Sequence, residues 1–297
     1  MAEEDKLVIQ QIAEERRQGA GTRKELYSKL EQELGLPVVS FFTSFRYPVM
    51  IEDNDADMIE GILQKCPLDN GFALLISSPG GNGLTAERII NVCRSYSGTQ
   101  NYVVIVPRKA KSAATMICFG ASKIIMGNSS ELGAIDPQQV IAEEDKRQKW
   151  FSVYNIVSSY RRLFKEAVQT KGNMQPYLQQ LANYDEREIA ECETVLELSE
   201  DIAIKTLKSG MMAGKSYKQI KKRIEIFLTP KETKVHGRPI YAKEAERHGL
   251  KIEIADVRST MWMLVYELYV RLNGLVSNDN IGKCIECKDY SFRGTFK

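Results

Sequence analysis

Short, uninterrupted apolar segments constrain the fold of this chain more than any other feature. Residues 72–76 and 102–106 are almost entirely apolar, and each segment is followed by a turn and a helix-like pattern. Strands that are apolar on both faces are typical of parallel sheets that lie between layers of helices. The sequence therefore predicts an α/β protein with a central, mostly parallel sheet.

The remaining pattern adds elements on both sides of these strands. Further strands are predicted at 37–43 and 123–126, and helices at 56–65, at 84–96 and from about Ser112 onward. Residues 142–229 are predicted to be mostly helical. The segment 242–252 reads as a helix that ends before a final strand.

Composition excludes several classes of protein. The 41 basic and 39 acidic residues leave a net charge of +2, so no strong field favours nucleic acid or an anionic membrane. No apolar run approaches the roughly 20 residues of a membrane helix, and the first residues are acidic, unlike a signal peptide. The six cysteines are expected to be reduced thiols. We therefore expect a cytoplasmic protein without membrane insertion.

Histidine is scarce, so any mechanism that needs an imidazole has only two candidates, His236 and His248. His248 precedes Gly249 at a predicted helix end, where the helix dipole favours a cation. His236 lies in a loop with glycine and proline neighbours. By elimination, His236 is the better candidate for a catalytic imidazole.

Two loops that follow predicted strands carry further candidates. Adjacent Gly80 and Gly81 can turn backbone N–H groups toward a phosphate or an oxyanion, although a plain strand-to-helix turn has the same composition. Ser112 and Thr115 are one helical turn apart and are expected to face one cleft. The alternative for Ser112 is a simple helix N-cap.

A third loop contains Asp136 directly before Pro137. A residue before proline favours extended backbone, so the carboxylate is expected to project from a strand end or loop. Ordinary turn chemistry is the alternative.

Five motifs in a fixed order carry a resemblance. They are LLISSPGGNG (74–83), AKSAATMICFGASKIIMG (110–127), LGAIDPQ (132–138), LKSGMMAGK (207–215) and HGRPIYAKEAERHGLKI (236–252). Together they closely resemble the serine dehydrogenase proteinase family, which is SppA-like and belongs to the ClpP/crotonase superfamily. The resemblance implies a ClpP/crotonase-like βα superhelical core. We expect a helical N-terminal extension (1–35), a serine peptidase domain (36–254) and a C-terminal helical extension and tail (255–297).

The resemblance also implies roles for individual residues. Ser112 would be the nucleophile, His236 the base and Asp136 the group that orients it, in the chain order Ser, Asp, His. The N–H groups of Gly80 and Gly81 would form the oxyanion hole.

Alternatives for the nucleophile and the base stay open. In the ClpP branch the nucleophilic serine follows two alanines, and Thr115 occupies that position here. SppA-like relatives use a lysine base, for which Lys111 or Lys165 would be available.

These residues indicate a serine peptidase that cleaves polypeptides through an acyl-enzyme without a cofactor. The alternatives are a crotonase-like acyl-CoA enzyme, or an inactive scaffold that binds peptides or partner proteins. The resemblance implies a homo-oligomer, and the sequence identifies no partner ATPase. An apolar helix face with Trp262, Leu264 and Leu268 is expected to pack on the core or to form a subunit interface.

Two further patterns are set aside. Residues 210–216 look like a phosphate-binding loop, but they have one residue too few between the glycines and follow a helix. Cys284 and Cys287 form a single CxxC without a second pair of ligands. We expect these two thiols to face solvent and to bind no metal.

Overall fold

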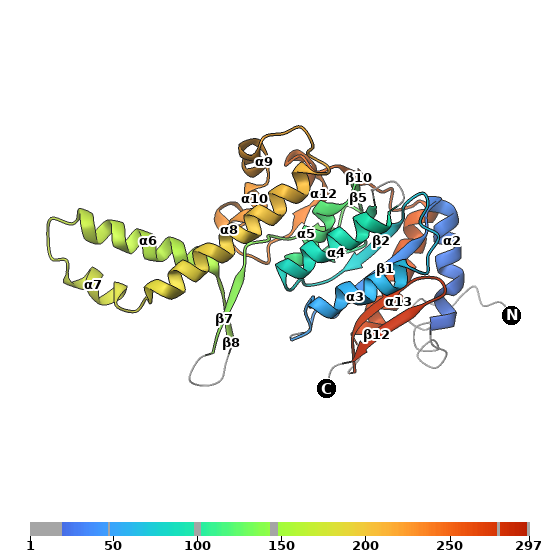
Figure 1. Cartoon of the computed structure of the whole chain (residues 1–297), viewed down its shortest axis with the longest axis horizontal. Helices are drawn as coiled ribbons and strands as arrows, with labels where there is room; N and C mark the ends of the chain where they lie inside the picture. Colours follow the sequence, from blue (N-terminus) through green and yellow to red (C-terminus); the bar gives the residue numbers. More distant parts are fainter. Residues whose placement is uncertain (1–19, 47, 98–101, 143–147, 278–279, 296–297) are drawn as a thin grey trace.

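A seven-stranded sheet forms the centre of the protein in the computed structural model (Figure 1), which describes residues 20–46, 48–97, 102–142, 148–277 and 280–295. Five strands are parallel, and the last two strands of the chain are antiparallel to their neighbours. In spatial order the strands are β10 (Ile252–Ile254), β5 (Lys123–Met126), β3 (Val103–Val106), β2 (Ala73–Ser77), β1 (Val38–Thr43), β11 (Ile281–Glu286) and β12 (Ser291–Thr295). The predicted α/β class with a parallel-rich sheet is confirmed.

Alternate side chains of these strands enter two separate apolar cores, because successive residues of a strand point to opposite faces. Phe41 and Leu74 belong to one core, and Phe42 and Leu75 belong to the other. The first core is covered by α3 (Asp53–Leu63), α4 (Gly83–Tyr96), α5 (Ala113–Gly120) and the C-terminal half of α8 (Glu186–Lys208). The second is covered by α2 (Lys24–Leu34) and α13 (Thr260–Val276). Every side chain of β1 and β2 is buried, which explains their apolar runs.

The apolar face of α13 packs on the sheet. Trp262 and Leu268 are buried in the second core, and Leu264 packs against it. The Trp262 ring fills the space beside Gly127, where an added Cβ would come within 2.5 Å of it. Of the two alternatives for this face, packing on the core is confirmed, and Trp262 is not available as the anchor of a subunit interface because the chain itself covers it.

The C-terminal segment is more than a helix and a tail. Strands β11 and β12 form a hairpin, and β11 pairs antiparallel with β1, so the end of the chain completes the main sheet. Residues 1–19 of the expected N-terminal extension lie outside the described residues. The remainder is a 3-10 turn, η2 (Ala20–Arg23), followed by α2.

The two cysteines of the C-terminal CxxC are buried. The prediction that both face solvent was wrong, since Cys284 is 0% exposed and Cys287 is 6% exposed. They lie on opposite faces of the sheet, because Cys284 belongs to the core under α13 and Cys287 to the core under α3.

A long helical arm projects from the body of the protein (Figure 1). It consists of α6 (Val153–Gln169), α7 (Gln175–Leu181) and the first half of α8. A hairpin of β7 (Gln138–Ala142) and β8 (Gln148–Ser152) leads into it and was missed by the sequence analysis, which expected helix from residue 142 onward. A small apolar cluster, which includes Val153, Val157 and Cys192, holds the arm together with the Arg161–Glu193 ion pair.

Smaller elements complete the fold around the main sheet. They are the short sheet of β4 (Lys109–Ala110), β6 (Glu131–Leu132) and β9 (Ile240–Tyr241), and the helices α9 (Tyr217–Arg223), α10 (Glu225–Leu228), α11 (Pro230–Thr233) and α12 (Ala242–Arg247). Residues 210–214 are a turn after α8, as predicted. In the described part of the chain, no helix has the length and apolarity to cross a bilayer.

We expect the ion pair that joins the two ends of the described chain to be important for stability. Arg23 donates two hydrogen bonds of 2.7 Å to Glu286, and both side chains are almost fully buried. Arg23→Met should lower the free energy of unfolding by about 3 kcal/mol, because it leaves the Glu286 carboxylate buried without its cation. The Ser291 hydroxyl and the Cys284 thiol remain as neutral donors to this carboxylate. Urea denaturation measures this change.

The neighbouring residue supplies the control. Lys24 pairs with Asp289 at 2.6 Å, but both side chains are about half exposed. Lys24→Met should therefore change the same free energy by about 0.5 kcal/mol or less. Equal losses in the two variants would contradict the importance of the buried pair.

Candidate active site

The glycine loop after β2 is held between two backbone segments. On one side, Ile51 N–H donates to the Gly80 carbonyl at 2.8 Å, and Asn82 N–H donates to the Ile51 carbonyl at 3.0 Å. On the other side, Ser78 exchanges backbone hydrogen bonds with Lys109 and Lys111. The Asn82 side chain then caps the N-terminus of α4. These bonds fix the loop at the carboxyl end of the sheet, where α/β proteins usually bind ligands.

Neither glycine of this loop tolerates a side chain. Gly80 and Gly81 have φ angles of +105° and +155°. A Cβ on Gly80 would lie 2.6 Å from the Ser112 Cβ, and one on Gly81 would lie 2.4 Å from the backbone of Ile51. The loop therefore packs directly against the turn that carries Ser112.

Ser112 occupies the position before α5, but it does not act as an N-cap. Its side chain accepts no hydrogen bond from the first turn of α5, so the N-cap alternative is wrong. Its backbone has φ +49° and ψ −121°, a conformation that residues with a Cβ rarely adopt. Strain of this kind persists where the surrounding structure enforces it, and it is frequent at functional sites.

Asp136 and His236 contact each other although they are 100 residues apart in the chain. His236 Nδ1 lies 2.7 Å from Asp136 Oδ1. The aspartate side chain is fully buried, whereas that of the histidine is 26% exposed. An ionised carboxylate only accepts hydrogen bonds, so Nδ1 carries the proton and Nε2 is left as an acceptor in the neutral ring.

The candidate residues converge on one cavity of about 920 Å³. Ser112 and His236 line it, as do Gly80 and Gly81, while Asp136 lies behind His236. Most of the remaining wall is apolar and includes Leu84, Met116, Trp150 and Leu198. The structure thus brings together all five residues of the expected site.

The N–H groups near Ser112 differ in their availability. Gly80 N–H donates to the Ser78 hydroxyl at 3.1 Å. The N–H groups of Gly81 and Ala113 make no hydrogen bond within the described part of the chain. This geometry favours Gly81 and Ala113 as donors to an oxyanion, and Ala113 was not among the predicted residues.

The hydroxyl of Thr115 has a structural role. Thr115 is fully buried, donates to the Ala110 carbonyl at 2.8 Å and accepts from Gly133 N–H at 3.0 Å. Its only proton is used in this bond, and the side chain does not line the cavity. The expectation that Ser112 and Thr115 share a cleft was wrong, and these contacts favour Ser112 as the nucleophile.

The two lysines are also placed away from this cavity. Burial lowers the pKa of Lys111, an effect that Glu131 opposes through a 2.8 Å ion pair. Lys111 Nζ also donates to the Leu132 carbonyl. Lys165 is exposed on α6. Neither residue lines the cavity with Ser112, so the geometry favours His236 as the base.

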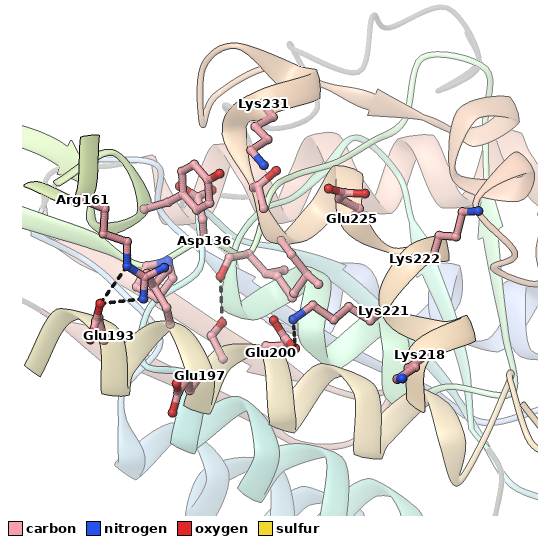
Figure 2. Close-up of a pocket in the computed structure, with 17 residues that line it drawn as sticks. Asp136, Arg161, Glu193, Glu197, Glu200, Lys218, Lys221, Lys222, Glu225 and Lys231 are labelled. Carbon is pink, nitrogen blue, oxygen red and sulfur yellow. Dashed lines mark hydrogen bonds and ion pairs between the residues drawn. The ribbon is translucent and has the colours of Figure 1, made fainter. Parts of the chain in front are cut away.

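Asp136 also borders a second cavity of about 540 Å³ (Figure 2). Charges of both signs line it, and ion pairs join Arg161 to Glu193 and Lys221 to Glu200. Neither Ser112 nor His236 lines this cavity. We therefore assign the chemistry to the larger cavity.

Two residues that hold Asp136 were missed by the sequence analysis. The Ser152 hydroxyl donates to Asp136 Oδ2 at 2.7 Å, and Gln138 Nε2 donates to the same oxygen at 3.0 Å. Ser152 directly precedes α6, where the local pattern indicates an N-cap, yet its side chain caps nothing in α6. No local signal connects it to a residue 16 positions earlier.

His248 has the structural role that was predicted for it. It follows α12 as the C-cap residue, and its Nδ1 lies 2.6 Å from the Arg223 carbonyl.

Comparison with known proteins relates part of the chain to one family. Residues 7–144 match the family model of the ClpP-like SDH-type serine proteinases. This match supports the predicted family over the matched residues. The matched segment contains the glycine loop, Ser112 and Asp136, and it ends before His236.

Two curated relatives come from Methanocaldococcus jannaschii. The uncharacterized protein MJ0137 is 36% identical over 104 residues, and the uncharacterized protein MJ1495 is 31% identical over 105 residues. Each alignment covers 35% of this chain and 32% of the relative. The chain thus spans about a third of the length of the curated relatives that it matches.

The strain at Ser112 yields a prediction about stability. Ser112→Gly should raise the free energy of unfolding by about 1 kcal/mol relative to Ser112→Ala, because glycine adopts positive φ without steric cost. Both variants remove the hydroxyl, so the difference between their free energies of unfolding reports the backbone strain. A glycine variant that is no more stable than the alanine variant in urea would contradict the strain.

Proposed function

We propose that this protein is a serine peptidase that cleaves polypeptides through an acyl-enzyme, with Ser112 as nucleophile, His236 as base and Asp136 as the orienting carboxylate. The observation that carries the proposal is the 2.7 Å contact of His236 Nδ1 with buried Asp136, at the edge of the cavity that Ser112 lines. A serine hydroxyl becomes a nucleophile when a positioned imidazole accepts its proton.

The proposed reaction uses each group in turn. His236 Nε2 accepts the Ser112 proton as Oγ attacks the peptide carbonyl, and it then delivers this proton to the departing amine. Asp136 keeps the imidazole in the required tautomer and stabilises its charged form. The N–H groups of Gly81 and Ala113 would donate to the oxyanion, which is often the largest electrostatic contribution to catalysis. Water then attacks the acyl-enzyme, and His236 again serves as the base.

The Asp136–His236 contact and the reactivity of Ser112 separate a peptidase from the two alternative functions. A crotonase-like acyl-CoA enzyme would need the N–H donors but not a serine paired with an imidazole, so the Asp136–His236 contact favours the peptidase. A fluorophosphonate probe should label Ser112 covalently. Tight peptide binding without labelling or turnover would instead support an inactive scaffold.

The nucleophile and base are tested by substitution. Ser112→Ala and His236→Ala should each lower kcat by about 10⁴-fold or more, and the double variant should lose no more than the single ones. The measurement is hydrolysis of a fluorogenic casein substrate, with circular dichroism to verify folding. Full activity in Ser112→Ala would refute the assignment.

Substitutions of the alternative bases serve as controls. Lys165→Met changes an exposed residue of the arm, and it should leave kcat within about twofold of the original. Lys111→Met tests the buried lysine, and most of the activity should remain in the folded fraction. A loss in either variant equal to that of Ser112→Ala would transfer the role of base to lysine.

We also propose that the protein is a cytoplasmic homo-oligomer. Six free cysteines are typical of a reducing compartment. Large apolar side chains are exposed on the arm, and they include Phe164, Val168 and Leu178. Stable interfaces bury about 800 Å² on each partner around apolar anchors.

Light scattering at micromolar concentration tests the assembly. Phe164→Glu should lower the measured mass, because it places an unpaired charge in the contact. A wild-type mass equal to one chain, 33.7 kDa, would refute the proposal. Met263→Glu, on the exposed side of α13, is the matched control and should leave the mass unchanged.

A further inference from the structure

Cys66 and Cys287 form a thiol pair that is remote from the candidate active site. Cys66 follows α3, and Cys287 follows β11. Both thiols line one surface pocket, and each has the other as the largest influence on its pKa. The pair lines a surface pocket of about 270 Å³, whereas Cys284, the other member of the CxxC, faces the opposite core. The structure therefore pairs Cys287 with a residue far away in sequence.

The surroundings of Cys287 stabilise a thiolate. The Cys66 thiol and the backbone N–H groups of Asp289 and Tyr290 lie near its sulfur and favour the charged form. The 287–290 turn that presents these N–H groups is closed by a 2.8 Å bond from Cys287 N–H to the Tyr290 carbonyl. The Cys66 thiol, supported by the two N–H groups, lowers the pKa of Cys287. Burial raises the pKa of the thiols of Cys93 and Cys284, which are fully buried.

Charges of both signs surround the pocket. Lys65 and Lys288 line it together with Glu31 and Asp289. Lys288 pairs with Glu31 at 3.2 Å, and Asp289 pairs with Lys24 at 2.6 Å. The carboxylates of Glu31 and Asp289 are thus paired with lysines, and the pocket can admit a small polar molecule. Reactive cysteines are found in partly accessible surroundings of this kind, next to basic groups.

We propose that Cys66 and Cys287 are a thiol–disulfide exchange site that reacts with small-molecule disulfides. The Cys287 thiolate attacks one sulfur of the small disulfide, which forms a mixed disulfide and releases one small thiolate. Cys66 then loses its proton to water and attacks the Cys287 sulfur, which releases the second small thiolate. Two protein thiols are oxidised to one disulfide, and one small disulfide is reduced to two thiols.

The order of attack follows from the two environments. The neighbouring Cys287, together with burial, raises the pKa of Cys66. The Cys66 thiol donates to the Ile62 carbonyl at 3.4 Å, which also favours its neutral form. Cys287 is therefore the first nucleophile, and Cys66, which lines the same pocket, resolves the mixed disulfide.

The test uses the reduced full-length protein and glutathione disulfide at neutral pH, followed by alkylation and non-reducing peptide mapping. The expected product is a Cys66–Cys287 disulfide, with a mass lower by two hydrogen atoms. A Cys284–Cys287 disulfide, or reaction at Cys287 no faster than at Cys93, would overturn the proposal. This measurement needs no variant, and it is independent of the peptidase assignment.

Single variants test the order of attack. Cys66→Ser should accumulate the glutathione mixed disulfide at Cys287, because the resolving thiol is gone. Cys287→Ser should slow the modification of Cys66 by about tenfold or more, since the more acidic thiol is lost. Cys284→Ser is the matched control and should form the disulfide at the wild-type rate. A mixed disulfide at Cys66 in the wild-type protein would show that the assigned order is wrong.

Discussion

The candidate site depends on the absence of side chains at Gly80 and Gly81. The Ile51 backbone and the Ser112 turn approach this loop so closely that any Cβ would overlap with them. The close packing also holds Ser112 at positive φ, because Gly80 contacts its Cβ from one side and α5 continues directly after it. One steric requirement thus orients the nucleophile candidate and leaves the adjacent N–H groups of Gly81 and Ala113 without partners in the described chain.

The rest of the fold places the partners of Ser112 from distant parts of the sequence. Asp136 precedes the β7–β8 hairpin, and His236 follows α11, so both depend on elements that lie outside the parallel sheet. The sheet in turn depends on the end of the chain. β11 pairs with β1, and the Arg23–Glu286 ion pair connects the start of α2 to β11. The C-terminal hairpin therefore extends the sheet that α13 covers, and no residue of the hairpin lines the cavity with Ser112.

The sequence was sufficient where a single segment determines the outcome. The apolar runs of β2 and β3, the turn at Gly80 and the helix after Ser112 follow from local patterns, and the five expected site residues do come together. It was insufficient where tertiary contacts decide. Trp262 was as well suited to an interface as to a core, and only the space beside Gly127 determines its position. The Ser152 hydroxyl donates to Asp136 and does not cap α6, and Cys287 shares a pocket with Cys66 while Cys284 faces the other core. No sequence spacing indicates these arrangements.

Ser152 connects the candidate site to the projecting arm, because it is the residue directly before α6. Its hydroxyl is bonded to Asp136, and α6 begins at the next residue. The first helix of the arm, α6, is 17 residues long, and it begins beside Asp136. Two successive contacts therefore connect the start of the arm, through the carboxylate of Asp136, to the imidazole of His236.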